Sequence, residues 1–505
     1  MSVDAIVIGA GHNGLVAAAR LGQAGRKVLV LEAQDRPGGL LGASGGMRIA
    51  PMPTGLHPDI ARTLALHRHG LSYDKPMTTI VLGSGAPVRI DGGNAAGVDA
   101  AMAADYARLH RRLVKQAGAL GQMLLKVPPR LSDGGVADLI SLGRMGLSVR
   151  MLGKADMRDL LRILLSNAWD LLNDEIGDGP LAAALAMDAT LGGAMGPRSP
   201  GTVLALLYRM AGQGAGAAGQ RAIPLGGPEA LVQALVKAVE ESGGQIRAGA
   251  PVERILVGDD DRVAGVRLAG GEEFRAPLVL SNAHPRRTLV DLLGVAEIDS
   301  EDARRARLMA TEGMVARLDL ALSSMPEVEG LGAGDLGQRL VIAPDMRAIE
   351  TAFNAAKYRA LPARPILECT IVPGDNPSLS VSAQFVPRTL KSGWIDADRA
   401  QLAASVLGVL DDALPGIAKR VTDTAIATPA DIEARFGLPG GHWHHGEFRV
   451  DQMLMLRPFG GAAQYRMPVA GLYLCGAGAH PGGDISGAPG WNAAGRALKD
   501  GRAAT

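Results

Sequence analysis

A glycine pattern near the N-terminus constrains the fold of this chain more than any other sequence feature. Gly9-x-Gly11-x-x-Gly14 lies between the β-branched run at residues 3–8 and a segment rich in Ala and Leu. Gly9 permits a tight turn, Gly11 lets a pyrophosphate approach the backbone, and Gly14 lets the following helix pack against the strand. Because a helix N-terminus offers free N–H groups to phosphates, the pattern predicts a dinucleotide-binding βαβ unit.

An acidic residue ends the second strand of this predicted unit. Residues 27–31 (KVLVL) form an apolar run, and Glu32 follows directly. A carboxylate at this position can accept hydrogen bonds from ribose hydroxyls, whereas a merely structural glycine turn would not account for it. The dinucleotide contacts predicted in this unit are Gly9, Ala10, Gly11, His12, Asn13, Gly14, Glu32 and Ala33.

Length and composition narrow the function classes. With 505 residues, the chain can form two or more lobes with separate cores. A net charge of +1 and 3% aromatic residues argue against nucleic-acid binding, which needs a basic surface and stacking platforms. Cys369 and Cys475 are far apart, so we expect neither a disulfide framework nor a metal site. Without a secretory signal or a membrane-spanning apolar stretch, a cytoplasmic location is expected.

The stretch after the acid distinguishes FAD from NAD. Residues 32–39 (EAQDRPGG) resemble the extended fingerprint of the glutathione-reductase-like FAD fold, in which an arginine and paired glycines follow the acid. This resemblance implies that Arg36, Gly38 and Gly39 contact FAD. Leu40, also assigned to the cofactor site, stands where that family usually has arginine. A second strand–GxGxxG–helix unit is not found, so a separate NAD(P)H domain is not expected.

The C-terminal region carries a more specific resemblance. Residues 472–498 (LYLCGAGAHPGGDISGAPGWNAAGRAL) are similar to the signature of phytoene-dehydrogenase-like flavoproteins. Residues 196–202 and 439–446 fit the branch that includes pyridine nucleotide-disulfide oxidoreductase domain-containing protein 2. The resemblance covers nearly the whole chain. It implies an α/β fold: a glutathione-reductase-like FAD-binding Rossmann domain with an inserted mixed and helical substrate domain.

The expected FAD-binding domain is noncontiguous. It comprises residues 1–75, 222–300 and 426–505, while residues 76–221 and 301–425 form the substrate or lid domain. Helical periodicity between about 98 and 220 and a hairpin pattern at 252–268 support this division.

The family resemblance also implies cofactor contacts outside the N-terminal unit. Gly476 and Asp484 would lie along the ribityl chain and pyrophosphate, although Asp484 could instead be a solvated loop acid. The last helix would direct its N-terminal dipole at the flavin. Val252 would pair its backbone with adenine, unless it is a plain sheet residue. The remaining implied contacts are Asn282, Gly487, Ala488 and Pro489.

Candidates on the substrate side are histidines and aromatic residues. His445, within HWHH at 442–445, could act as a base or orient substrate, or it could be a loop histidine bonded to backbone. His57 is a second catalytic candidate, on a loop that crosses the flavin in such folds. Tyr465 and Trp491 are the late aromatic residues that could form the substrate cage of an amine oxidase.

A periodic run of cations is the remaining motif. Arg150, Lys154, Arg158 and Arg162 recur every four residues. On one helix they would form a stripe suited to anionic lipid headgroups, and the alternative is a solvated face over a lid helix. Gly153 argues against one continuous helix. Peripheral membrane contact is therefore compatible with a cytoplasmic protein.

Together these features predict an FAD-dependent oxidoreductase, a dehydrogenase, desaturase or oxidase. It would transfer hydride from an apolar or small organic substrate, including a lipid-like one, to N5 of a noncovalent flavin. O₂ or a quinone would accept the electrons, and homo-oligomers are compatible with the sequence. The alternatives are a flavin-containing amine oxidase and a flavin-stabilised binding or scaffold protein with little turnover.

Overall fold

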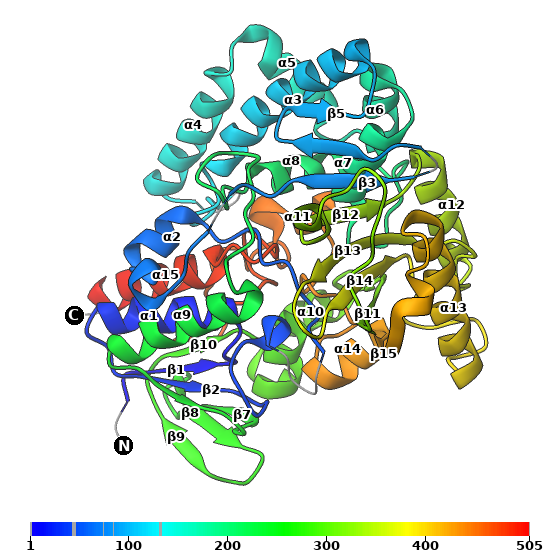
Figure 1. Ribbon diagram of the computed structural model, residues 1–505. Coiled ribbons are helices and arrows are strands. Elements are labelled where there is room, and N and C mark those ends of the chain that lie inside the picture. The colour runs from blue at the N-terminus through cyan, green and yellow to red at the C-terminus, as the bar shows by residue number, and fades with distance from the viewer. Residues whose placement is uncertain (1–2, 43–46, 74, 84, 131–133, 504–505) are drawn as a thin grey trace.

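The computed structural model describes residues 3–42, 47–73, 75–83, 85–130 and 134–503. Within these residues the chain forms two large lobes, each built around its own sheet (Figure 1). Separate apolar cores fill the lobes, as the chain length predicted. Among the described residues, no helix is both long and apolar enough to cross a bilayer.

The first lobe contains a five-stranded parallel sheet. Continuous apolar runs form its central strands because these strands are buried on both faces. The pairing Ile6↔Leu29 joins the first two strands, and Ile6↔Val279 adds a strand from much later in the chain. In spatial order the strands are β16 (Leu472–Leu474), β10 (Val279–Ser281), β1 (Ala5–Ile8), β2 (Val28–Leu31) and β6 (Gln245–Arg247).

Helices cover one face of this sheet, and a small antiparallel sheet covers the other (Figure 1). The helices are α1 (His12–Gln23), α9 (Gly227–Glu241) and α15 (Ala488–Ala503). The small sheet contains β7 (Val252–Val257), β8 (Val263–Leu268) and β9 (Glu273–Arg275). This layering confirms the predicted glutathione-reductase-like fold, and the predicted hairpin corresponds to β7 and β8.

The second lobe contains an eight-stranded mixed sheet. Its pairs are antiparallel except for β12 with β3. In spatial order the strands are β15 (Val421–Ala427), β11 (Val315–Leu322), β14 (Ser378–Gln384), β13 (Ile366–Val372), β12 (Arg339–Ile342), β3 (Thr79–Leu82), β4 (Val88–Asp91) and β5 (Asn94–Ala96).

A group of helices completes the second lobe (Figure 1). Those between β5 and β6 confirm the helical pattern read at 98–220; they are α3 (Ala100–Gly121), α4 (Val136–Arg150), α5 (Lys154–Ile163), α6 (Ala168–Ile176), α7 (Pro180–Thr190) and α8 (Thr202–Ala211). The other helices of this lobe are α11 (Ala333–Leu336), α12 (Met346–Lys357), α13 (Asp396–Ala413) and α14 (Pro429–Phe436), whereas α2 (Pro58–Thr63) and α10 (Ser300–Leu308) pack on the core of the first lobe.

Two boundaries differ from the sequence-based expectations. The cationic run is divided between two helices, because Gly153 adopts a φ of +92° and separates α4 from α5. Strand β15 crosses the expected domain boundary at residue 425, because it pairs with β11 and so belongs to the second sheet. The strands of the parallel sheet all come from segments 1–75, 222–300 and 426–505.

Arg457 joins two loops that meet between the lobes. Its side chain is fully buried and donates six hydrogen bonds to five backbone carbonyls. Four of these carbonyls belong to residues 444–452, and the fifth belongs to Ala477 in the loop after β16. Burial lowers the pKa of Arg457 to about 10, which still leaves it charged at neutral pH. The guanidinium therefore fixes the 444–452 segment against the C-terminal loop.

Replacing this guanidinium should destabilise the protein. Each buried carbonyl left without a donor costs about 1–3 kcal/mol, so Arg457→Met should lower the free energy of unfolding by about 3 kcal/mol or more. Thermal unfolding of the purified variant measures the loss. Arg254→Met is the matched control, since Arg254 is exposed. Equal unfolding temperatures in the two variants would contradict this stabilising role of Arg457.

Candidate functional site

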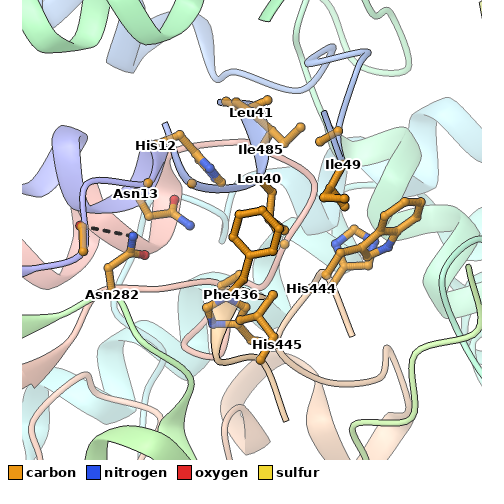
Figure 2. Close-up of a pocket in the computed structure, with 18 of the residues that line it drawn as sticks. His12, Asn13, Leu40, Leu41, Ile49, Asn282, Phe436, His444, His445 and Ile485 are labelled. Atoms are coloured by element: carbon orange, nitrogen blue, oxygen red, sulfur yellow. Dashed lines mark hydrogen bonds between the residues drawn. The ribbon is translucent and has the colours of Figure 1, made fainter. Parts of the chain in front are cut away.

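A cavity of about 440 Å³ lies at the carboxyl edge of the parallel sheet (Figure 2). Its lining combines the ends of β1 and β2, the loop after β10 and the C-terminal loop with strands of the second sheet. Open parallel sheets bind ligands outside the carboxyl ends of their strands. The cavity is therefore placed where the glycine pattern predicted a dinucleotide.

Glycines shape the cofactor end of the cavity. A Cβ atom at Gly14 would collide with the carbonyl oxygen of Gly9, so only glycine allows α1 to begin this close to β1. A Cβ atom at Gly11 would lie 2.8 Å from Nδ2 of Asn282, in the space between the first turn of α1 and the loop after β10. Gly9 has a φ of +92°, which favours glycine. These contacts account for all three glycines of the motif.

Glu32 lines the same cofactor end of the cavity. Its Oε2 accepts a hydrogen bond from the Ala10 N–H at 2.6 Å, and its Oε1 accepts one from the Gln34 N–H at 2.9 Å. Burial raises the pKa of Glu32, and these backbone donors oppose that shift. Each carboxylate oxygen keeps a second lone pair that can face the cavity. The side chain can therefore still accept hydrogen bonds from ribose hydroxyls, and this contact stays a prediction.

Several polar atoms around the cavity are buried without a hydrogen-bond partner in the described part of the chain. They are Nε2 of His12, Oδ1 of Asn13, Nε2 of His284, Nε2 of His444 and Nδ1 of His445. Buried polar groups in folded proteins are nearly always bonded, so this arrangement indicates a polar ligand. Gly9, Gly11 and Gly14 form a glycine cradle at the start of α1. Together with this cradle and Glu32, the residues with unpartnered atoms fit FAD.

The histidines of the site are neutral imidazoles at physiological pH. Burial and the nearby Arg457 lower the pKa of His445 to about 3, and burial lowers that of His12 to about 4. The rings of His284 and His445 are 5.8 Å apart. Nδ1 of His444 accepts from the Asp484 N–H at 3.3 Å, so this ring directs an Nε2–H into the cavity. These rings can donate or accept hydrogen bonds, and they are weak bases.

Asp484 is not a solvated loop acid, which corrects one of the two alternatives. Its side chain is 13% exposed and forms a bidentate pair with Arg221, with 3.0 Å between Nη1 and Oδ1. Burial alone would raise the pKa of Asp484, but Arg221 and Arg209 hold it below its usual value. The predicted ribityl contact stays a prediction; Asp484 does line the cavity.

The other predicted cofactor residues divide into two groups. Arg36 lies outside the cavity, with about half of its side chain exposed and a 3.6 Å contact to Asp35. Gly476, Gly487, Ala488 and Pro489, in the C-terminal loop and at the start of α15, do not line the cavity itself. The same holds for Ala10, Gly14 and Gly38, which adjoin lining residues of the N-terminal unit. The predicted residues that line it are Gly9, Gly11, His12, Asn13, Glu32, Ala33, Gly39, Leu40, Val252, Asn282 and Asp484.

Three predicted substrate-side residues do not line the cavity. Nδ1 of His57 accepts from the Asp59 N–H and caps α2. The Tyr465 hydroxyl donates to the carbonyl of His480 at 2.9 Å, and the guanidinium of Arg20 stacks on Trp491. The geometry therefore does not support His57 as a flavin contact or Tyr465 and Trp491 as an aromatic cage. His445 does line the cavity.

Sequence reasoning missed several lining residues. Phe436 and Trp443 supply the aromatic rings of the cavity, and Figure 2 shows Phe436 between His445 and Leu40. Trp443 lies within the HWHH cluster, so that motif could have identified it. His284 follows β10 by three residues, and no local pattern distinguishes it from an ordinary loop histidine.

Comparisons with known proteins agree with this geometry. A family model for an NAD(P)-binding Rossmann-like domain matches residues 7–44. Pyridine nucleotide-disulfide oxidoreductase domain-containing protein 2 of Rattus norvegicus is 30% identical, over 98% of this chain and 93% of that protein. The neurosporene-forming phytoene desaturase of Rhodobacter capsulatus is 27% identical, over 95% of this chain and 91% of the desaturase.

A solved structure shows the same fold. Cyclohexylamine oxidase from Brevibacterium oxydans superimposes with a TM-score of 0.58 at 16% identity, covering all of both chains. This likeness concerns the fold, whereas the full-length sequence relatives show the family. The chain belongs to the phytoene-desaturase-like family of FAD-dependent oxidoreductases that includes pyridine nucleotide-disulfide oxidoreductase domain-containing protein 2.

Proposed function

We propose that this protein binds FAD noncovalently in the cavity and removes hydride from a C–H bond of a small organic substrate. The polar atoms around the cavity that are buried without a hydrogen-bond partner among the described residues carry this proposal. When bound, FAD would supply a hydride acceptor at N5, and O₂ or a quinone would be the final electron acceptor. Cys475 is buried and does not line the cavity, which supports noncovalent binding.

The residues of the chain hold and orient the reactants. The N-terminus of α1 and the glycine cradle bind the pyrophosphate, and Glu32 binds a ribose. The Nε2–H of His444 and the free Nδ1 of His445 offer one donor and one acceptor at the inner part of the cavity. Substrate binding displaces water from this space, so the neutral rings orient the substrate rather than remove a strongly held proton.

Amine oxidation is the second candidate. Phe436 and Trp443 place aromatic rings on the cavity wall, as an amine-oxidising site would require. The fold is also that of cyclohexylamine oxidase. A binding or scaffold role with little turnover predicts a bound flavin that no substrate reduces.

We also propose that the region of α4 and α5 contacts an anionic membrane surface. Arg150, Lys154 and Arg158 are exposed, and the same segment of the chain carries apolar side chains that are more than half exposed. These apolar residues are Val136, Leu139, Ile140, Leu147, Met151, Leu161 and Leu165. Helix α4 contains no buried residue among those described. An apolar surface flanked by cations suits the boundary between lipid tails and anionic headgroups.

Loss of the glycine cradle should abolish flavin binding and activity together. Gly11→Val places a side chain between α1 and Asn282, where the pyrophosphate must pass, so FAD content should fall at least about tenfold. Absorbance of the purified protein measures FAD content, and anaerobic flavin reduction by a panel of amines, alcohols and acids measures activity. Gly143→Ala is the control, because a Cβ atom there meets nothing within 4 Å. Wild-type protein without flavin, or with flavin that no compound reduces, would contradict the proposal.

The pH dependence of catalysis should contain no inflection caused by titration of His445. Because burial keeps its pKa near 3, this imidazole is already neutral throughout about pH 5–8 and does not titrate there. The profile of kcat/KM against pH should therefore have the same shape in the wild type and in His445→Asn, a substitution that tolerates the φ of +56° at this position. An inflection near neutral pH that disappears in the variant would show that His445 titrates as an ordinary base.

Charge reversal on α4 and α5 should weaken lipid binding. Each basic residue at an anionic surface contributes about 1 kcal/mol, so Arg150→Glu/Arg158→Glu should reduce binding to phosphatidylglycerol-containing vesicles at least about tenfold. Cosedimentation with these vesicles and with pure phosphatidylcholine vesicles measures the difference. The control Arg254→Glu/Lys419→Glu changes the net charge equally at exposed sites elsewhere. Equal sedimentation of both double variants would refute this contact.

A further inference from the structure

The second sheet contributes a polar wall to the cavity. Arg339 on β12, Glu368 on β13 and Ser382 on β14 all line it. Nε of Arg339 donates to Oε1 of Glu368 at 2.6 Å, and both side chains are less than one tenth exposed. A hydrocarbon chain packed against this pair would remove its remaining water without replacing the hydrogen bonds. The wall therefore suits a polar substrate group.

A second cavity lies behind part of this wall. It also measures about 440 Å³, and it shares Met77, Arg209, Arg221 and Arg339 with the first cavity. Asp188 lines only the second cavity. Three arginines therefore stand at the junction between the two spaces.

Two of these arginines, Arg221 and Arg339, donate hydrogen bonds to carboxylates. Arg221 forms the bidentate pair with Asp484 and also donates to the Thr54 hydroxyl at 3.1 Å. Arg339 donates to Glu368 and, at 2.7 Å, to Oδ1 of Asp188. The pKa values of both guanidinium groups are raised by these carboxylates, although burial acts in the opposite direction.

Arg209 differs from its two neighbours. Its Nη2 lies 3.2 Å from Oδ1 of Asp188, the oxygen that already accepts from Arg339. Its Nε is buried and has no hydrogen-bond partner among the described residues. The side chain is only 12% exposed. Arg209 is thus a nearly buried guanidinium with spare donor capacity, at a wall common to two cavities.

We propose that Arg209 binds an anionic head group, a carboxylate, of the substrate. A guanidinium presents parallel N–H donors that match the two oxygens of a carboxylate, and this pairing gains strength where water is excluded. An ammonium group has no acceptor atoms and so cannot form this pair with Arg209. The inference rests on the proposed function and narrows its substrate to organic acids, with the carbon chain extending toward His444 and His445.

Three probes of equal chain length test this assignment. Hexanoate, hexanamide and hexylamine are titrated into the FAD-containing protein, and binding heat and flavin absorbance are recorded. Hexanoate should bind at least about tenfold more tightly than hexanamide, because only the acid forms a charge-assisted pair. Equal binding of the amide, or tighter binding of the amine, would overturn the assignment.

Variants locate the effect at Arg209. Arg209→Gln should abolish the preference for hexanoate over hexanamide while keeping the FAD content of the control Arg254→Gln. Should Arg209→Gln not fold, Arg209→Lys serves instead, because it keeps the charge without the forked donors and should reduce the preference without abolishing it. A preference that survives unchanged in whichever variant folds would overturn the proposal.

Failure of this inference is distinguishable from failure of the proposed function. Binding heat requires no flavin, whereas absorbance changes do. A protein that binds hexanoate through Arg209 but holds no FAD would contradict only the proposed function. A protein that holds reducible FAD but shows no preference for the acid would contradict only the role of Arg209.

Discussion

The close approach of α1 to β1 is the constraint on which the rest of the site depends. Gly14 permits it, because a side chain there would collide with the Gly9 carbonyl. The first turn of α1 then faces the ends of β2 and β10, and Glu32 and Asn282 reach the same edge of the sheet. A pyrophosphate bound there would be held by backbone N–H groups and a helix dipole.

The cavity extends from the apolar parallel sheet to the second sheet, whose side chains at the cavity include charged groups. The parallel sheet is buried on both faces and contributes backbone edges, whereas the second sheet contributes Arg339 and Glu368. At the site, the buried guanidinium of Arg457 holds the histidine segment against the C-terminal loop. Fixed polar groups on one wall and neutral imidazoles on another would orient a bound substrate before any chemistry occurs.

The sequence predicted the cofactor half of this site better than the substrate half. The glycine motif, Glu32 and the β7–β8 hairpin are local patterns, because neighbouring residues determine the turn, the strand end and the helix start. Arg209, Arg339 and Glu368 lie on separate elements and meet only through the tertiary fold. Tyr465 and Trp491 were expected at the flavin by their position in the sequence, yet their rings pack elsewhere. Burial of Asp484 likewise depends on Arg221, which is distant in sequence.

The most direct test of the account is anaerobic reduction of the bound flavin by fractionated small molecules from cell extract. Extract is separated on an anion exchanger, and each fraction is added to the oxidised holoprotein while flavin absorbance is followed. We expect the reducing compound in the retained, anionic fraction, with reduction lost in Arg209→Gln. Reduction by neutral lipid fractions alone, or by none, would contradict an oxidoreductase that acts on small organic acids.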